Sequence, residues 1–176
     1  QDMQKMGQAL QQREQELQAL KQQQIPQVPL QQQIDQPIMQ PRFPRSQKEM
    51  EDLEKLFTTA QEKMGGKIDF VLHSIGMSVN IRKKIPYVES NYDYFAKGID
   101  VSAMSFHKML AVAKKLDAIS EWGSVVALTY MAAQRTYPFY TDMADIKAML
   151  ESIARSFGYH YGVAKKVRIN TVSQSP

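Results

Sequence analysis

From residue 47 onward, three short apolar runs alternate with stretches of helical periodicity. The runs cover residues 68–73, 124–129 and 167–172, the length of a strand rather than of a helix. Their apolar residues follow one another without strict alternation, so we expect both faces of each strand to be buried, as in a parallel sheet. The order helix, strand, helix, strand, helix, strand favours right-handed crossover connections. The sequence therefore predicts an α/β fold: part of a doubly wound, Rossmann-like parallel sheet.

Apolar spacing and capping residues define the helices of this portion. Ser46 and Glu49 have the spacing of a capping box before the first helix, and Asn91 suits the N-cap of the second. Gly65 and Gly66 are expected to end the first helix. The three predicted helices are residues 48–64, 92–116 and 141–161, with loops at 77–90 and 132–139.

The first 46 residues have a different composition, rich in Gln and Pro. Residues 1–24 form a polar stretch whose Met and Leu residues follow a heptad seam interrupted at Arg13, which predicts either a short coiled coil or a lone amphipathic helix. Five prolines between residues 25 and 45 exclude a long helix and predict an extended linker. We therefore expect two parts, an N-terminal arm with a linker (1–46) and a Rossmann-like domain (47–176).

Composition excludes several classes of protein. The chain has no Cys, which excludes disulfides and thiolate metal sites and fits a reducing cytoplasm. Its three His residues have no partners at ligand spacing, so we predict no metal site. A net charge of +4 without a dense basic stripe gives no support to nucleic-acid binding. No apolar run has the length of a membrane span, and the N-terminus lacks the apolar core of a signal peptide.

Small and polar residues follow each predicted strand. In doubly wound sheets, ligands bind beyond the carboxyl ends of the strands. The segments in that position are residues 73–76, 129–130 and 173–176. Gly76 would allow a ligand to approach the backbone closely.

Tyr140 and Lys147 lie seven residues apart where the third helix is predicted to begin. Seven residues are nearly two helical turns, so both side chains would project from one face. A phenol can donate a hydrogen bond to a carbonyl oxygen on which negative charge develops, and an ammonium can bind ribose hydroxyls. Spacing alone leaves open a chance pairing on an exposed helix.

These residues resemble a known family, the NADH-dependent enoyl-acyl-carrier-protein reductases of the short-chain dehydrogenase superfamily. The similar segments, in order, are Leu72-His73-Ser74-Ile75-Gly76, Leu128-Thr129-Tyr130, Tyr140-x-x-Met143-x-x-x-Lys147, Val167-Arg168-Ile169-Asn170 and Ser173-Gln174-Ser175-Pro176. The Tyr–Lys spacing and the second Tyr at a strand end are typical of this branch of the superfamily. The resemblance covers residues 48–176.

The resemblance implies a reaction of fatty acid biosynthesis, in which NADH delivers hydride to a trans-2-enoyl thioester carried by acyl-carrier protein. Tyr140 would stabilise the enolate, Lys147 would hold the nicotinamide ribose and Tyr130 would position the substrate. It also implies a cytoplasmic homotetramer built partly through the long helices. The remaining implied contacts are Ser74, Ile75 and Gly76 with the cofactor and Ser78 with the acyl chain. Arg82, Lys83 and Lys84 are either a docking site for the acidic carrier protein or a solvated face.

The chain departs from the family at both ends. The family begins with a strand and a Gly-rich turn for the pyrophosphate, whereas the only glycines in residues 1–65 are Gly7 and Gly65. The acidic position near the adenine and the segments that follow Pro176 in the family are also absent. We expect unpaired strand edges and uncovered apolar faces, weak NADH binding and little or no turnover by this chain alone. The rival hypothesis is an inactive, oligomerising interaction protein, against which the retention of Tyr130, Tyr140 and Lys147 argues.

Overall fold

The computed structural model describes residues 12, 13, 15 and 47–174. The chain divides into two compact units, residues 1–41 and 42–176. In the first unit the described residues Gln12, Arg13 and Gln15 are helical. The predicted heptad seam and proline linker otherwise fall outside the described residues, as do the Ser46 cap and the last two residues of the chain.

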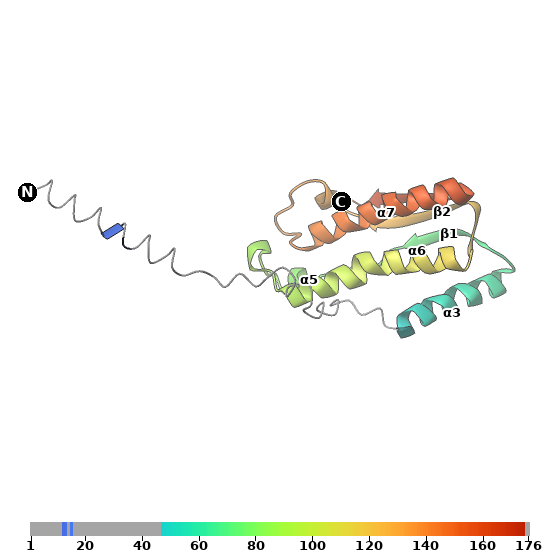
Figure 1. The fold of residues 1–176 in the computed structure, drawn as a ribbon, viewed down its shortest axis with the longest axis horizontal. Helices are drawn as coiled ribbons and strands as arrows, with labels where there is room; N and C mark the ends of the chain where they lie inside the picture. Colours follow the sequence, from blue (N-terminus) through green and yellow to red (C-terminus); the bar gives the residue numbers. More distant parts are fainter. Residues whose placement is uncertain (1–11, 14, 16–46, 175–176) are drawn as a thin grey trace, which may run out of the picture. The chain divides into compact units, whose positions relative to one another are not determined.

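Three parallel strands form the sheet of the second unit (Figure 1). They are β1 (Ile68–His73), β2 (Ile119–Thr129) and β3 (Arg168–Ser173), in the order β1-β2-β3 with both pairs parallel. The predicted Rossmann-like α/β class is confirmed. Strand β2 begins at Ile119, earlier than predicted. The apolar pattern did not reveal its first residues, because Ser120, Glu121 and Gly123 interrupt it where the register with β1 shifts.

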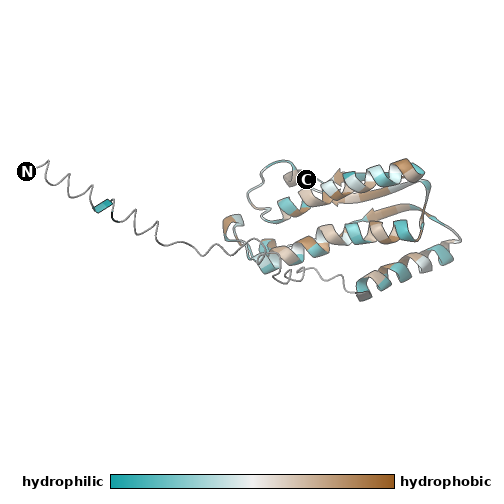
Figure 2. Cartoon of the chain, viewed as in Figure 1, coloured by the Kyte–Doolittle hydropathy of each residue, from teal (hydrophilic) through white to brown (hydrophobic). Residues whose placement is uncertain are grey.

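Helices α3 (Gln47–Met64), α6 (Ser105–Lys115) and α7 (Met143–Lys165) lie side by side along the sheet (Figure 1). Figure 2 shows that the strands are mostly hydrophobic, whereas each of these helices carries both kinds of residue. The apolar sides of the helices meet the sheet in one core, which includes Phe106, Leu110, Val125, Ile146 and Leu150. Because helices cover this face, the carboxyl ends of the strands are held in a fixed relation to α7.

The predicted helix at 92–116 is interrupted. It consists of α5 (Tyr92–Ile99), a π-helical turn η2 (Asp100–Met104) and α6. Asn91 caps it as predicted, with its side-chain oxygen 3.0 Å from the amide of Tyr94. Within the π turn, the Ser102 hydroxyl accepts from the amide of Met77 at 2.9 Å and donates to its carbonyl at 3.2 Å. The interruption thus fixes the segment that follows β1.

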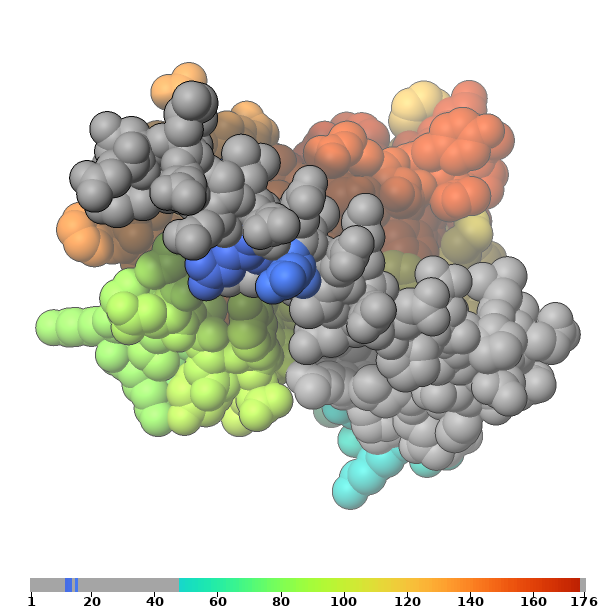
Figure 3. Space-filling model, turned by 60° about the vertical axis from the view of Figure 1, so that its left-hand side comes forward, coloured from blue at the N-terminus to red at the C-terminus, as the bar shows by residue number. Residues whose placement is uncertain are grey.

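Three short helical elements lie in the predicted loops. They are α4 (Val79–Arg82), η1 (Tyr87–Glu89) and η3 (Met131–Ala133). Figure 3 shows residues 80–100 and 130–140 on one face of the molecule. Tyr87 and residues 132–138 line a cavity of about 450 Å³. These two segments border the carboxyl ends of the strands.

The far side of the sheet is less covered by the described residues. Phe70 and Leu72 of β1 are 56% and 53% exposed, and Val172 of β3 is also exposed. Two large apolar side chains on one edge strand agree with the expectation of uncovered apolar faces. No helix in the described part of the chain is long and apolar enough to cross a membrane.

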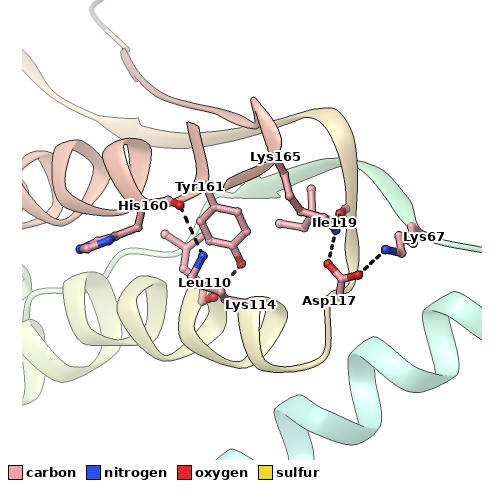
Figure 4. A network of polar contacts seen from close by, with 8 residues as sticks. All are labelled: Lys67, Leu110, Lys114, Asp117, Ile119, His160, Tyr161 and Lys165. Carbon is pink, nitrogen blue, oxygen red and sulfur yellow. Dashed lines mark hydrogen bonds and ion pairs between the residues drawn. The ribbon is translucent and has the colours of Figure 1, made fainter. Parts of the chain in front are cut away.

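A polar network closes the opposite end of the sheet, where the strands begin (Figure 4). Asp117 accepts hydrogen bonds from Lys67 and Lys165. Lys165 also donates to the carbonyl of Ile119 at 2.9 Å, and the Tyr161 hydroxyl donates to the carbonyl of Leu110 at 2.8 Å. The network ties the C-terminal end of α7 to the amino ends of β1 and β2.

Candidate active site

A cavity of about 540 Å³ lies at the carboxyl ends of the strands. The residues that line it are Ser74, Ile75, Gly76, Leu128, Thr129, Tyr130, Tyr140, Met143, Lys147 and Gln174. They come from the ends of all three strands and from the start of α7. Six of the seven residues predicted from the sequence are therefore brought together, and only Ser78 lies outside the lining.

Tyr140 reaches the cavity from a turn rather than from a helix. Helix α7 begins at Met143, two residues later than predicted. The amide of Tyr140 donates to the carbonyl of Tyr137 at 3.0 Å, and the amide of Met143 donates to the carbonyl of Tyr140 at 3.1 Å. The prediction that Tyr140 and Lys147 project from one face of a helix is therefore wrong, although both line the same cavity.

Lys147 is buried and 6% exposed. Its Nζ donates to the carbonyl of Leu128, at the end of β2, over 2.6 Å. Burial lowers the pKa of Lys147 below its usual value, because the charged form loses hydration. Among the described residues no carboxylate forms an ion pair with it. An ammonium has three donors, so donors remain for a ligand.

Gly76 leaves the space beside this ammonium open. A Cβ at position 76 would lie 3.6 Å from the Lys147 Nζ and 3.2 Å from the Met143 methyl carbon. The second distance is tighter than ordinary van der Waals contact, so a side chain here would push Met143 into the cavity. The predicted close approach of a ligand at Gly76 thus has a structural basis.

The two predicted tyrosines pack against each other. The ring centroids of Tyr130 and Tyr140 lie 4.5 Å apart, and Tyr137 meets Tyr130 edge-on at 5.7 Å. Burial, and then the neighbouring Tyr130, raises the pKa of Tyr140. The pKa of Tyr130 is raised by loss of hydration and then by Tyr137. Both phenols therefore stay protonated at neutral pH and can donate hydrogen bonds.

His73, at the end of β1, is buried against Phe106, with ring centroids 5.0 Å apart. Its Nε2 lies 2.9 Å from the Ser105 hydroxyl, which itself donates to the carbonyl of Val101 at 2.6 Å. Nε2 is therefore the donor, and Nδ1 has no partner among the described residues. Burial, and then the charge of Lys147, lowers the pKa of His73 to about 4, so the ring is neutral. Residues 47–174 contain no cluster of three or more potential metal ligands.

Ser78 and Asp142 form a separate polar group. The Ser78 hydroxyl donates to the Asp142 carboxyl group at 2.7 Å, and both side chains are buried. The predicted contact of Ser78 with the acyl chain remains a prediction. The Asp142 carboxyl group accepts hydrogen bonds from three side chains. No sequence signal marks this, since an Asp at a helix start is common.

Comparisons with known proteins identify the family of the chain. Residues 6–176 match the family model described as enoyl-(acyl carrier protein) reductase. The chain is 34% identical over 125 residues to the Rhizobium meliloti (strain 1021) protein named enoyl-[acyl-carrier-protein] reductase [NADH] 1, covering 70% of this chain and 44% of that protein. The Rickettsia bellii protein named enoyl-[acyl-carrier-protein] reductase [NADH] FabI is 30% identical over 126 residues, covering 72% of this chain and 47% of the relative.

Solved structures give the same result. The crystal structure of FabI from Alistipes finegoldii is 64% identical with a TM-score of 0.70, over 72% of this chain and 47% of that one. The crystal structure of the FabI–NADH complex from the same organism matches with the same identity and score. The chain thus spans about half the length of the relatives it matches. The resemblance read from the sequence is confirmed, and the chain belongs to the enoyl-(acyl carrier protein) reductase family.

Proposed function

We propose that the chain is an NADH-dependent enoyl-acyl-carrier-protein reductase of fatty acid biosynthesis, with Tyr130, Tyr140 and Lys147 as its catalytic residues. One observation carries the proposal: two protonated phenols and a buried ammonium that pairs with no carboxylate of residues 47–174 line one cavity at the carboxyl ends of the strands. This combination offers hydrogen-bond donors to a carbonyl oxygen on one side and to ribose hydroxyls on the other.

The lining fits the nicotinamide-ribose end of NADH. Gly76 leaves room for a flat ring beside Met143, and Lys147 keeps donors for ribose hydroxyls while the carbonyl of Leu128 fixes its position. Ser74 and Ile75 complete this wall. When bound, NADH supplies the hydride, and the protein supplies orientation and hydrogen bonds.

The phenols account for the substrate side. Negative charge develops on the thioester carbonyl oxygen as the β-carbon is reduced, and a donor aimed at that oxygen lowers the barrier. Tyr140 takes this role, because its raised pKa keeps the proton on the phenol. Tyr130 packs on Tyr140 and positions both the phenol and the substrate.

The partner is an acyl-carrier protein that presents the enoyl thioester. Arg82, Lys83 and Lys84 are exposed on the segment after β1, where a basic patch suits an acidic carrier. Lys83 is held by Tyr94, whose hydroxyl accepts from Nζ at 2.7 Å. The proposal includes a homotetramer and a cytoplasmic location, as the family resemblance implies.

A second candidate function is self-association without catalysis. The exposed apolar side chains of Phe70 and Leu72 on an edge strand favour it. The double variant Phe70→Ser/Leu72→Ser separates the two candidate functions. If the chain is an interaction protein, sedimentation should show that the variant has lost its oligomer. If the chain is a reductase, the site at the strand ends should keep its catalytic activity.

The test is deuterium transfer, which detects slow turnover. The purified 176-residue chain is incubated with a crotonyl thioester and [4-²H]NADH at millimolar concentration, and the butyryl thioester is analysed by mass spectrometry. We expect slow formation of product with one deuterium at the β-carbon. A Tyr130→Phe/Tyr140→Phe chain purified in the same way controls for contaminating reductases. No deuterated product, or equal amounts from both proteins, contradicts the proposal.

A further inference from the structure

The turn that carries Tyr140 has an unusual backbone. Thr141, directly after Tyr140, has φ +41°, in the left-handed region that β-branched residues rarely adopt. The turn is tight on both sides of it, because the amide of Met143 donates to the carbonyl of Tyr140 at 3.1 Å and that of Ala144 donates to the carbonyl of Thr141 at 3.2 Å. A strained residue persists only where its surroundings hold it, and here it lies next to the phenol.

Asp142 supplies the contacts that hold this turn. Its side chain is fully buried. One carboxyl oxygen accepts from the Thr141 hydroxyl at 2.9 Å and from the Ser78 hydroxyl at 2.7 Å. The other accepts from the Asn80 side-chain amide at 2.8 Å. The carboxyl group makes no capping bond to the backbone of α7, so its hydrogen bonds serve the turn and the segment after β1 instead.

The partners of Asp142 are themselves fixed. The Ser78 hydroxyl accepts from the amide of Ile81 at 3.0 Å and caps α4. The Asn80 side chain accepts from the amide of Asn91 at 3.1 Å and donates to the Asn91 carbonyl at 3.3 Å. Asp142 thus joins the turn before α7 to two helix starts that lie far away in the sequence.

We infer that Asp142 is a positioning residue for Tyr140: its carboxyl group holds the left-handed turn at Thr141 and ties it to residues 78–91, which keeps the Tyr140 phenol packed on Tyr130 at the cavity. The position of the Tyr140 phenol follows from these hydrogen bonds and ring contacts alone. The effect of Asp142 on turnover rests in addition on the proposed function.

The first test follows the phenol directly. A fluorotyrosine is placed at position 140 of the full chain, and its ¹⁹F resonance is compared between the parent and Asp142→Ala. We expect the resonance to shift and broaden, because the ring leaves its fixed packing on Tyr130. Asp145→Asn is the matched control: it removes a nearby negative charge in the first turn of α7, which accepts an exposed hydrogen bond from Tyr87 of the same segment, and should leave the resonance unchanged.

The second test separates positioning from a general structural role. Glycine adopts positive φ without strain, so Thr141→Gly makes the turn independent of the carboxyl group. We expect Thr141→Gly/Asp142→Ala to return the resonance toward that of the parent. A folded Asp142→Ala chain with an unchanged resonance overturns the inference, and so does a double variant no closer to the parent than Asp142→Ala.

A third measurement covers loss of folding and loss of function. If circular dichroism shows that Asp142→Ala is unfolded, Asp142→Asn takes its place in the test, since it keeps one accepting oxygen. We expect a smaller shift of the ¹⁹F resonance in Asp142→Asn, and an unshifted resonance would contradict the inference. In an active parent, we expect Asp142→Ala to lower kcat about tenfold while the KM for NADH changes less than about twofold, since Lys147 is untouched. A parent without activity refutes the proposed function and leaves the ¹⁹F result decisive for positioning.

Discussion

Two lysines on α7 donate to the two ends of the same strand. Lys147 donates to the carbonyl of Leu128, near the carboxyl end of β2, and Lys165 donates to the carbonyl of Ile119, at its amino end. Lys165 also pairs with Asp117 (Figure 4), whereas no described carboxylate pairs with Lys147. The same residue type is neutralised at one end of the sheet and left buried without an acid at the other.

The two lysines differ in what they can contribute: Lys165 connects elements of the fold, and Lys147 keeps donors for a ligand. A lysine that pairs with an acid near the surface connects elements of the fold, and the free-energy cost of desolvating its charge is small. A buried lysine without an acid is disfavoured in the folded protein and keeps donors for a ligand. The strained turn at Thr141 and the neutral His73 lie at this same end. Variants at the two ends should therefore separate activity from stability.

The largest expected effect is on the rate, from Tyr140→Phe. Removal of the hydroxyl takes away the donor to the thioester oxygen, so deuterium transfer to the crotonyl thioester should fall about 100-fold. Tyr159→Phe, which changes an exposed tyrosine on α7 away from the cavity, is the control and should keep the parent rate. Equal rates for the two variants would remove Tyr140 from the mechanism.

Next in size is the contrast between Lys147→Met and Lys165→Met. Loss of charge-assisted hydrogen bonds to the ribose should weaken NADH binding about 10- to 100-fold in Lys147→Met, measured by fluorescence titration. The folded-state pKa of Lys147 is lowered, so below that pKa its charge opposes folding, and its removal should not reduce the free energy of unfolding.

Lys165→Met should show the opposite pattern. It breaks the Asp117 pair and the Ile119 hydrogen bond, which should lower the free energy of unfolding by about 1 kcal/mol and leave NADH binding unchanged. Urea denaturation of both variants measures this. A stability loss in Lys147→Met as large as that in Lys165→Met would erase the distinction between the two ends.

A smaller effect is expected from Gly76→Ala. The added methyl displaces the flexible end of Met143, at a strain of about 1 kcal/mol, which would weaken NADH binding about fivefold. Gly66→Ala is the control, because a Cβ there meets nothing within 4 Å. Unaltered NADH affinity in Gly76→Ala would place the cofactor elsewhere.

The smallest effect is expected at the opposite end, from Asp117→Asn. Hydrogen bonds from Lys165 and then Lys67 lower the pKa of Asp117 from 3.8 to about 2. Its contribution is therefore present above pH 3.8 and lost as the pH falls to about 2. Because the side chain is largely exposed, the variant should lose only about 0.5 kcal/mol at pH 7, and this loss should shrink as the pH falls through about 2. A loss as large at low pH as at pH 7 would exclude the ion pairs as its cause.

The sequence predicted the fold where the local pattern was continuous. Strand β1 was placed correctly, because a short apolar run, interrupted only by Asp69, ends before Ser74. Strand β2 was placed only in part, because Ser120, Glu121 and Gly123 interrupt the apolar pattern of its first residues, where its register with β1 shifts. The break in the helix after Asn91 was missed, because it depends on a tertiary contact between Ser102 and the Met77 backbone.

The sequence predicted which residues line the cavity better than it predicted their geometry. Strand ends and the Tyr–Lys spacing identified six of the residues that line the cavity. The left-handed turn at Thr141 and the burial of Asp142 were not foreseen, because φ and long-range hydrogen bonds leave no trace in spacing. The neutral state of His73 likewise depends on packing by residues distant in the sequence.

The most direct test of the central claim is methyl NMR of the chain with ¹³C-methyl methionine. The Met143 methyl lies beside Gly76 in the proposed nicotinamide site, whereas Met109 lines a separate apolar groove beside β1. With millimolar NADH, we expect an intermolecular NOE between the reduced nicotinamide ring and the Met143 methyl, lost in Lys147→Gln. An NOE to Met109 instead, or none to Met143 at saturating NADH, would contradict the assignment of this cavity.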